Sequence, residues 1–299
     1  MKETFDTPVL LLAFNRPDTT RLVLEEIRKI NPKKLFVSVD GARNEEEWKK
    51  VNEVRKIVSS VDWDCKLKKR FPKKNLGMKE GILGAIDWFF ENVDEGIILE
   101  DDGLPSQDFF RFCKEMLEKY RNDEKIMHIN GCNFQRGRAN TKDSYYFSIL
   151  PYTYGFAMWK NKRKKFDSEM KGYLELRKNF PKIFPNIFMR KYLTNLMDDG
   201  RKNPVAVDTQ WFFSIIKNKG VCIVPNKNLI KGIGFSKEAT HTKVSDSYLS
   251  MPFQKLEFPL KHPLKITLNK KADERYVRWL LKNKIKKHFR LKTGLYKLL

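Results

Sequence analysis

Short apolar runs alternate with longer amphipathic segments along the first 125 residues. The runs are too short for helices and have the composition of buried strands, whereas the segments between them repeat apolar residues at helical spacing. A strand–helix rhythm of this kind predicts a mostly parallel sheet with right-handed crossovers. The predicted strands are residues 8–14, 35–39, 65–70 and 96–99, and the predicted helices begin near Asp18, Asn44, Asn75 and Ser106, with Leu22, Val23, Ile27 and Ile30 on the apolar face of the first.

The pattern continues less regularly after residue 125. Residues 126–130, 145–150 and 221–224 read as strands, and a helix with an apolar face opens at Asp208. The aromatic, glycine-containing segment 151–159 fits either a pocket for a sugar or base or the protein core, and core is favoured for each ring taken singly.

The strand at residues 96–99 ends in three consecutive acids, Glu100, Asp101 and Asp102. Ligands of open α/β sheets bind outside the carboxyl ends of strands. Adjacent carboxylates raise one another's pKa unless a cation compensates their charge. Because Mg²⁺ needs only one or two protein carboxylates beside a substrate phosphate, the acids suit a metal site. A solvated turn explains them equally well, since Asp-Gly is a turn former.

Composition limits the class of protein. A chain of 299 residues with 41% hydrophobic and 13% aromatic residues is globular, and it is long enough for one large domain or two smaller ones. Its apolar runs fall far short of the roughly 20 residues of a membrane span, and an early acid argues against a secretory signal, so we expect a cytoplasmic protein.

No glycine motif of a dinucleotide-binding fold or P-loop occurs. The widely spaced cysteines read as buried thiols: Cys65, Cys113, Cys132 and Cys222.

The net charge of +23 calls for an anionic partner, which could be a lipid surface, a nucleic acid or a phosphorylated substrate. Residues 271–299 carry ten Lys or Arg against two acids, with apolar and aromatic residues between them. This pattern predicts a basic amphipathic helix suited to an anionic membrane surface. A solvated helix packed on the domain accounts for it equally well.

The ordered set of motifs resembles the GT-A class of nucleotide-sugar glycosyltransferases. Within that class the chain looks closest to the Golgi β-1,2-N-acetylglucosaminyltransferases, whose metal motif is also Glu-Asp-Asp, while its later motifs look like bacterial relatives that build surface polysaccharides. The similarity covers roughly residues 8–242. Its motifs are Ala13–Arg16, Val37–Asp40, Asn75–Gly77, Glu100–Asp102 with Ser106–Phe110, Gly155–Lys160, Asp208–Trp211 and Asn228–Thr242.

The resemblance implies a GT-A α/β fold, with a mostly parallel sheet flanked by helices. Residues 1–125 would form the nucleotide-sugar-binding half, residues 126–270 the mixed acceptor-binding and catalytic half, and residues 271–299 a helical basic tail. The implied activity is metal-dependent, inverting transfer of a sugar from a nucleotide-diphosphate donor, with UDP as the first choice. The acceptor would be a hydroxyl of a glycan or lipid-linked acceptor in surface polysaccharide synthesis.

The resemblance also assigns roles to single residues. Asp102 would coordinate Mn²⁺ or Mg²⁺ at the donor diphosphate, and His241 would assist at the metal or diphosphate. Asp101 or Glu100 would contact the ribose or the donor sugar. The remaining donor-binding positions would be Arg16, Asp40 and Asn75.

Asp208 matches the neighbourhood of the family's general base, which would take the proton of the acceptor hydroxyl. A general base contributes about 10²–10⁴-fold to rate. The relatives place two adjacent acids before the tryptophan, whereas here the spacing is Asp208-x-x-Trp211. The pair Asp198-Asp199 is therefore a rival base, although Asp-Asp-Gly is also an ordinary turn.

Two other functions compete with this interpretation. A sugar-phosphate nucleotidyltransferase shares the sheet type and acids, but it usually has a glycine-rich phosphate loop that Phe14–Pro17 lacks. A non-catalytic nucleic-acid binder would explain the charge, but no recognition motif is visible and the basic residues are spread widely. We therefore expect no specific nucleic acid partner. The Golgi enzymes have a leading membrane anchor that is not seen here, which favours a cytoplasmic enzyme resting on the inner face of a membrane.

Overall fold

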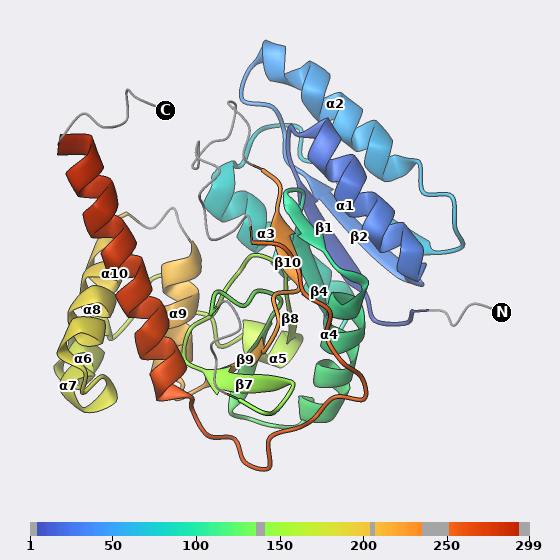
Figure 1. The fold of residues 1–299 in the computed structure, drawn as a ribbon. Helices are drawn as coiled ribbons and strands as arrows, with labels where there is room; N and C mark the ends of the chain where they lie inside the picture. The colour runs from blue at the N-terminus through green and yellow to red at the C-terminus, as the bar shows by residue number, and fades with distance from the viewer. Residues whose placement is uncertain (1–4, 136–140, 204–206, 235–250, 293–299) are drawn as a thin grey trace.

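The computed structural model describes residues 5–135, 141–203, 207–234 and 251–292, with side chains up to residue 282 (Figure 1). Short strands and longer helices alternate through most of these residues. The strands are β1 (Val9–Ala13), β2 (Lys34–Val39), β3 (Lys66–Arg70), β4 (Glu95–Glu100), β5 (Gly103–Pro105), β6 (Ile126–Asn130), β7 (Tyr145–Ser148), β8 (Phe156–Trp159), β9 (Val221–Pro225) and β10 (Ile230–Gly232).

Eight strands form one mixed sheet in the order β3-β2-β1-β4-β8-β6-β9-β7. Strands β3, β2, β1 and β4 are parallel, with Val9 paired to Leu35 on one side and to Ile97 on the other. Strand β8 runs antiparallel to both β4 and β6, and β9 is parallel to β6, so six of the eight strands share one direction. Only β7, at the edge, joins β8 in the opposite direction. The expected mostly parallel α/β fold with a mixed second half is confirmed.

Helices cover both faces of the sheet. In Figure 1, α1 and α2 lie on one side of β1, and α3 lies on the other. The helices are α1 (Pro17–Ile30), α2 (Glu45–Ser59), α3 (Gly77–Asn92), α4 (Gln107–Tyr120), α5 (Lys160–Arg163), α6 (Tyr173–Lys178), α7 (Phe180–Ile183), α8 (Ile187–Lys202), α9 (Val207–Lys217) and α10 (Lys270–Lys292).

The central strands are apolar on both faces because each face packs against helices. Val9 and Leu11 of β1 belong to the large core that includes residues of α1, α2 and α4. Leu10 and Leu12 point to the opposite face, where they join Phe89 of α3 and Trp211 of α9. This arrangement explains why the sequence of β1 is a continuous apolar run instead of an alternating one.

Two predicted helix starts are confirmed by their caps, and a third is displaced. Asn44 Oδ1 accepts a hydrogen bond from the Glu47 N–H at 3.0 Å, and Ser106 Oγ accepts one from the Phe109 N–H at 3.3 Å. Asp18, however, lies in the first turn of α1, whose N-cap is Arg16. Pro17 sets this boundary because its fixed φ suits the first helical position.

Other local predictions are corrected. Leu22 is exposed, and Leu24 takes its place on the buried face of α1. Asp198 and Asp199 lie inside α8 and do not form a turn. Residues 156–159, which the pattern did not predict as a strand, form β8, and the buried rings of Tyr152, Phe156 and Trp159 confirm core over pocket at these positions.

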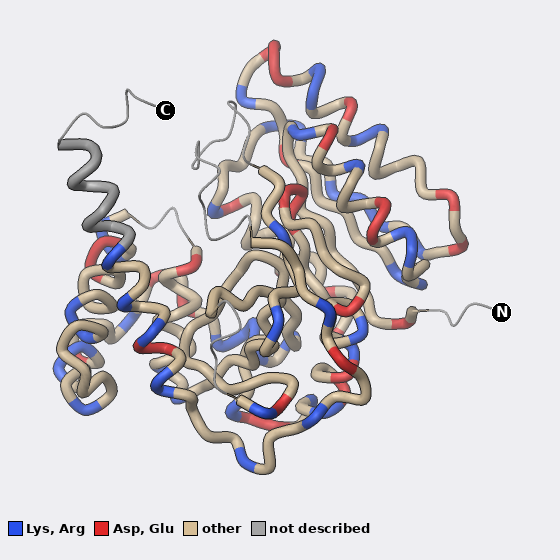
Figure 2. Tube along the Cα trace, viewed as in Figure 1, with Lys and Arg blue, Asp and Glu red and all other residues tan. Residues whose placement is uncertain are grey.

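The first half of α10 packs on the domain. Ala272, Tyr276 and Val277 are buried, and the Asp273 carboxylate accepts hydrogen bonds from Ser148 Oγ at 2.5 Å and from the Ile149 N–H at 3.2 Å. Lysine and arginine continue along this part of the helix (Figure 2). In the described part of the chain, no helix combines the length and apolar character needed to cross a membrane. Membrane binding by the basic tail stays a prediction.

Candidate active site

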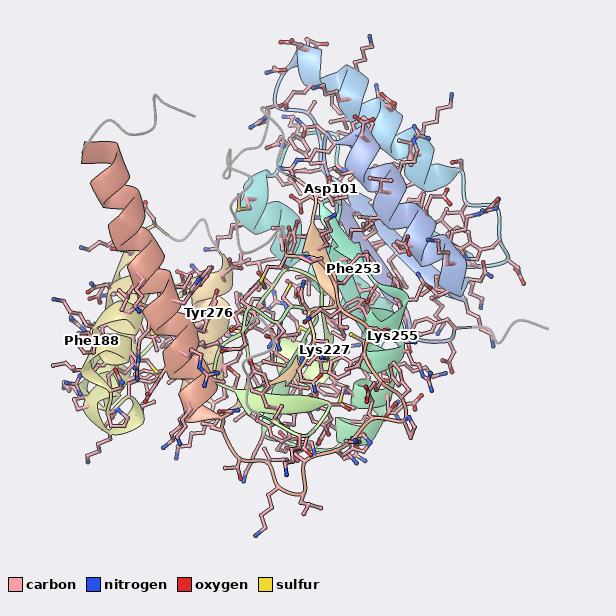
Figure 3. The ribbon with its side chains drawn as sticks, viewed as in Figure 1. Asp101, Phe188, Lys227, Phe253, Lys255 and Tyr276 are labelled. Carbon is pink, nitrogen blue, oxygen red and sulfur yellow. The ribbon has the colours of Figure 1, made fainter. Side chains whose placement is uncertain are left out.

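The predicted ligand-binding residues meet at the carboxyl edge of β1, β2 and β4. Arg16 follows β1 and Asp40 follows β2. Asp101, which is labelled in Figure 3, follows β4. A cavity of about 270 Å³ opens at this edge. It is lined by Leu12, Ala13, Phe14, Asn15, Arg16, Ser38, Asp40, Arg43, Asn75, Gly77, Met78, Gly81, Ile82, Glu100 and Asp101.

Arg16 provides an internal counter-charge for the acids. Its guanidinium hydrogen-bonds Asp102 Oδ2 and lies 3.6 Å from Asp101 Oδ1. Burial lowers the pKa of Arg16, but the charges of Asp102 and Asp101 outweigh burial and raise this pKa overall. Asp101 Oδ2 also accepts the Phe14 N–H at 3.0 Å. The loop after β1 is therefore attached to the end of β4 through the acids themselves.

Two of the three acids have raised pKa values in this environment. Burial raises the pKa of Asp101 to about 7, and the neighbouring Asp102 charge adds to the effect. Burial raises the pKa of Glu100 well above its usual range, and the charges of Asp102, Asp208 and Asp101 raise it further. One arginine thus leaves the acidic cluster undercompensated, and an additional cation would favour its ionised form.

Asp102 has one carboxylate oxygen available for such a cation. Its Oδ1 is buried and has no hydrogen-bond partner, while its backbone oxygen accepts hydrogen bonds from the Tyr154 hydroxyl and, at 2.9 Å, from the Ile233 N–H. A Cβ on Gly234 would overlap Asp102 Oδ2 and lie 2.8 Å from its Cβ, so only glycine fits beside this side chain. A fixed, unpartnered carboxylate oxygen is a suitable ligand for Mg²⁺ or Mn²⁺.

The described side chains contain no group of three or more His, Cys, Asp or Glu arranged around a common metal position. A single protein carboxylate is compatible with Mg²⁺, which keeps several waters and substrate phosphate oxygens in its shell. His241, the second predicted metal ligand, lies outside the described residues. The test of the metal site therefore centres on Asp102.

Asp40 and Asn75 join two loops at the cavity wall. Asp40 Oδ1 accepts the N–H groups of Gly41 at 2.8 Å and Leu76 at 3.0 Å. Asn75 Nδ2 donates to the Gly41 carbonyl at 2.7 Å, and Asn75 Oδ1 accepts the Gly77 N–H at 3.1 Å. These bonds fix the start of α3 against the end of β2. The predicted contacts of both residues with a nucleotide stay predictions.

Asp208 reaches the acidic cluster from the first turn of α9. Its charge contributes to the raised pKa of Glu100. The surrounding protein displaces water and raises the pKa of Asp208 itself, although the residue keeps an exposed surface. Thr153, in the connection before β8, donates a hydrogen bond to Asp208 Oδ1.

The rival acids are held elsewhere. Asp198 accepts a hydrogen bond from the Tyr173 hydroxyl at 2.6 Å and lies 3.1 Å from Arg177, so it links α8 to α6. Asp199 accepts the Asn203 N–H through its backbone carbonyl near the end of α8. Asp208, by contrast, is hydrogen-bonded to Thr153, and the next residue, Tyr154, donates to the backbone oxygen of Asp102.

Four residues near the acids were not predicted as site residues. Thr153 and Tyr154 belong to the aromatic segment before β8, and Gly234 lies within the last motif of the resemblance. Arg43 lines the cavity with its guanidinium 5.4 Å from the centre of the Phe14 ring. Only Gly234 lies within such a motif, and the contacts of all four residues join segments far apart in the sequence.

Comparisons with known proteins give no family assignment. No family model matches the chain, and no curated protein matches it. Several solved structures match at 10–12% sequence identity. Mouse xyloside xylosyltransferase 1 matches with 12% identity and a TM-score of 0.37, covering 72% of this chain and 82% of that one. A UDP-glucose pyrophosphorylase matches with 11% identity and a TM-score of 0.39, covering 77% and 92%.

The glycosyltransferase GlyE of Streptococcus pneumoniae TIGR4 matches with 12% identity and a TM-score of 0.34. The match covers 71% of this chain and 43% of GlyE. Both sugar transferases and a nucleotidyltransferase thus occur among the similar structures. Because all of these TM-scores are below 0.5, the function of this chain is argued from its own site.

Proposed function

We propose that this chain is a metal-dependent glycosyltransferase that moves a sugar from a nucleotide-diphosphate donor to an acceptor hydroxyl. The observation that carries the proposal is the buried Asp102 Oδ1, which has no partner and belongs to a carboxylate bonded to Arg16, a residue that lines the cavity at the carboxyl edge of the sheet. A second carboxylate, Asp208, is hydrogen-bonded to Thr153, and the next residue, Tyr154, is hydrogen-bonded to the backbone oxygen of Asp102. Together they supply a cation ligand and a base in one site.

The donor would lie along the cavity, with its diphosphate near Arg16 and Asp102. Asp101 and Glu100 would contact the ribose or the donor sugar, and Asp40 and Asn75 would hold the nucleoside end. A divalent ion on Asp102 would stabilise the negative charge that develops on the departing nucleoside diphosphate. Ionisation of Asp101, which its pKa of about 7 places near neutrality, would strengthen the hold on the cation.

Asp208 would act as the general base. Its carboxylate takes the proton of the acceptor hydroxyl while the acceptor oxygen bonds to the anomeric carbon and the bond to the diphosphate oxygen breaks, which inverts the configuration. The raised pKa of Asp208 suits this role, because a stronger base accepts the proton more readily. Thr153 would orient the carboxylate through its hydrogen bond.

We further propose a UDP-hexose or UDP-N-acetylhexosamine donor and a glycan or lipid-linked acceptor, as in the synthesis of surface polysaccharides. An enzyme of this kind would work in the cytoplasm, at the inner face of a membrane, attached by residues 271–299. Because Ala272, Tyr276 and Val277 are buried, a truncation after Lys282 tests the tail without removing the packed turns of α10. Unchanged binding to anionic vesicles would rule out attachment by residues 283–299.

The site is tested by thermal shift with nucleoside diphosphates and sugar nucleotides, with and without Mn²⁺. A ligand at about 100 times its Kd stabilises a protein by about 2.7 kcal/mol, which such an assay detects. One nucleotide should stabilise the wild type only with metal, and Asp102→Asn should abolish this response. Asp94→Asn, an exposed acid on the opposite edge of the sheet, is the matched control. A metal response that survives Asp102→Asn would refute the site.

The reaction is tested by product analysis. Release of a nucleoside diphosphate on addition of acceptor identifies a glycosyltransferase, whereas formation of pyrophosphate identifies a nucleotidyltransferase. Asp208→Asn should keep the thermal response to donor and lose about 10²–10⁴-fold in turnover. Full turnover by this variant would exclude Asp208 as the base.

A further inference from the structure

A group of exposed apolar and basic residues lies where α7 leads into α8. Ile187 and Phe188, the first two residues of α8, are 61% and 65% exposed. Proline and lysine side chains around them are exposed as well. We call this group the α8 tip, and it consists of Pro181, Lys182, Pro185, Ile187, Phe188 and Lys191.

The fold holds the two large apolar side chains outward. Asn186 caps α8 by accepting the N–H groups of Phe188 and Met189, each at 3.1 Å. Met189, Leu193 and Met197 form the buried face of the helix. At 100° per residue, Ile187, Phe188 and Lys191 fall on the opposite face. Their exposure is thus fixed by a capped, packed helix.

The α8 tip is positively charged as well as apolar. Residues 179–197 contain no Asp or Glu, and they carry Lys182, Arg190 and Lys191. The acids of the neighbouring elements are already paired, since Glu175 lies 2.7 Å from Lys178 and Asp198 lies 3.1 Å from Arg177. The α8 tip therefore carries a net positive charge.

We propose that the α8 tip binds the surface of a bilayer that contains anionic phospholipid. Exposed apolar side chains beside cations are the chemistry of interfacial membrane binding, in which the apolar groups enter the headgroup region and the cations meet anionic headgroups. The absence of acids from residues 179–197 favours this partner through charge complementarity. Helices α8 and α10 contact each other, so the basic helix α10 lies on the same flank (Figure 1).

Vesicle flotation tests the proposal without substrate, so its outcome is independent of the catalytic proposal. The full chain is mixed with phosphatidylcholine vesicles that contain or lack phosphatidylserine. Wild type should float with the anionic vesicles, and Ile187→Ser with Phe188→Ser should bind at least about tenfold more weakly. Leu264→Ser is the matched control, because Leu264 is 102% exposed and lies outside the α8 tip.

Charge reversal separates the electrostatic part. Lys182→Glu with Lys191→Glu should weaken the preference for phosphatidylserine at least about 25-fold, since each cation near an anionic surface contributes roughly a fivefold gain in binding. The proposal is overturned if wild type binds neither kind of vesicle, if the serine variant binds like wild type, or if Leu264→Ser weakens binding equally. Light scattering that shows a wild-type dimer broken by Phe188→Ser would assign the α8 tip to a second copy of the chain. A thermal midpoint equal to that of wild type confirms that each variant is folded.

Discussion

Replacement of Asp101 by Asn should stabilise the ligand-free protein in alkaline solution and have little effect in acid. The carboxyl group is buried, with 6% of the residue exposed, and its pKa is about 7. In an unfolded chain the pKa of Asp is about 3.9. Between these values the folded protein keeps a proton that the unfolded chain releases, so this group lowers the free energy of unfolding as the pH rises from about 4 to 7.

The size of the effect follows from the shift in pKa. A shift of about three units at 1.36 kcal/mol per unit sets an upper bound of about 4 kcal/mol above pH 7. Asn can still accept the Phe14 N–H, but it loses the attraction of Arg16, which lies 3.6 Å from Asp101 Oδ1. We therefore expect Asp101→Asn to gain about 1–3 kcal/mol near pH 8 and almost nothing near pH 4.

Urea unfolding, followed by tryptophan fluorescence at several pH values, measures the difference in the free energy of unfolding between variant and wild type. Both proteins are analysed with the same slope of this free energy against urea concentration. Burial lowers the pKa of His128 to about 4, so this group adds stability as the pH rises from about 4 to 6.5, which is opposite to the effect of Asp101. The variant must therefore be compared with wild type at each pH. Asp64→Asn, at an exposed position, is the control. An equal difference in stability at both ends of the pH range would refute the reasoning.

Three further changes test the structure at other points. Gly234→Ala should displace Asp102, lower the thermal midpoint and reduce metal-dependent turnover about 100-fold; a normal response to nucleotide and metal would contradict the contact. His128→Phe should remove the contribution of this imidazole, which lowers stability as the pH falls from about 6.5 to 4, and parallel acid-unfolding curves of variant and wild type would disprove this. Ser106→Ala should cost about 1 kcal/mol in urea unfolding, whereas Ser106→Asp should retain the cap and most of the stability.

The parallel half of the sheet could be predicted because its signals are local. Continuous apolar runs indicated strands buried on both faces, and the caps at Asn44 and Ser106 marked helix starts within a few residues. Strand direction then brought Arg16, Asp40 and the acids to one edge. This convergence follows from topology, since the carboxyl ends of parallel strands lie together.

The wrong prediction of a turn at residues 198–200 depends on a tertiary contact. The sequence Asp198-Asp199-Gly200 favours a turn, but Thr209 packs so closely on Gly200 that an added Cβ would lie 2.6 Å from Thr209 Cβ. The helix continues through this glycine because α8 packs on α9 there. Local turn propensity was outweighed by helix packing.

The roles of Thr153 and Tyr154 were not predictable for a similar reason. Both residues reach the acids because β8 is inserted antiparallel between β4 and β6, a pairing that no local pattern specifies. Periodicity identified the segment as aromatic and largely buried, but it contained no information about the neighbour of β4.

The small β5–β10 ribbon has a consequence for folding. It pairs Gly232 with Gly103 and thereby sets Ile233 and Gly234 against Asp102. Contacts between such distant segments form late, because the intervening chain must first lose its freedom. A nascent chain that has made only the first four strands would carry the acids with Arg16 and Phe14 but without Ile233 and Gly234. Metal and nucleotide would then bind firmly only after synthesis has passed residue 234, so ligand binding would report completion of the whole sheet.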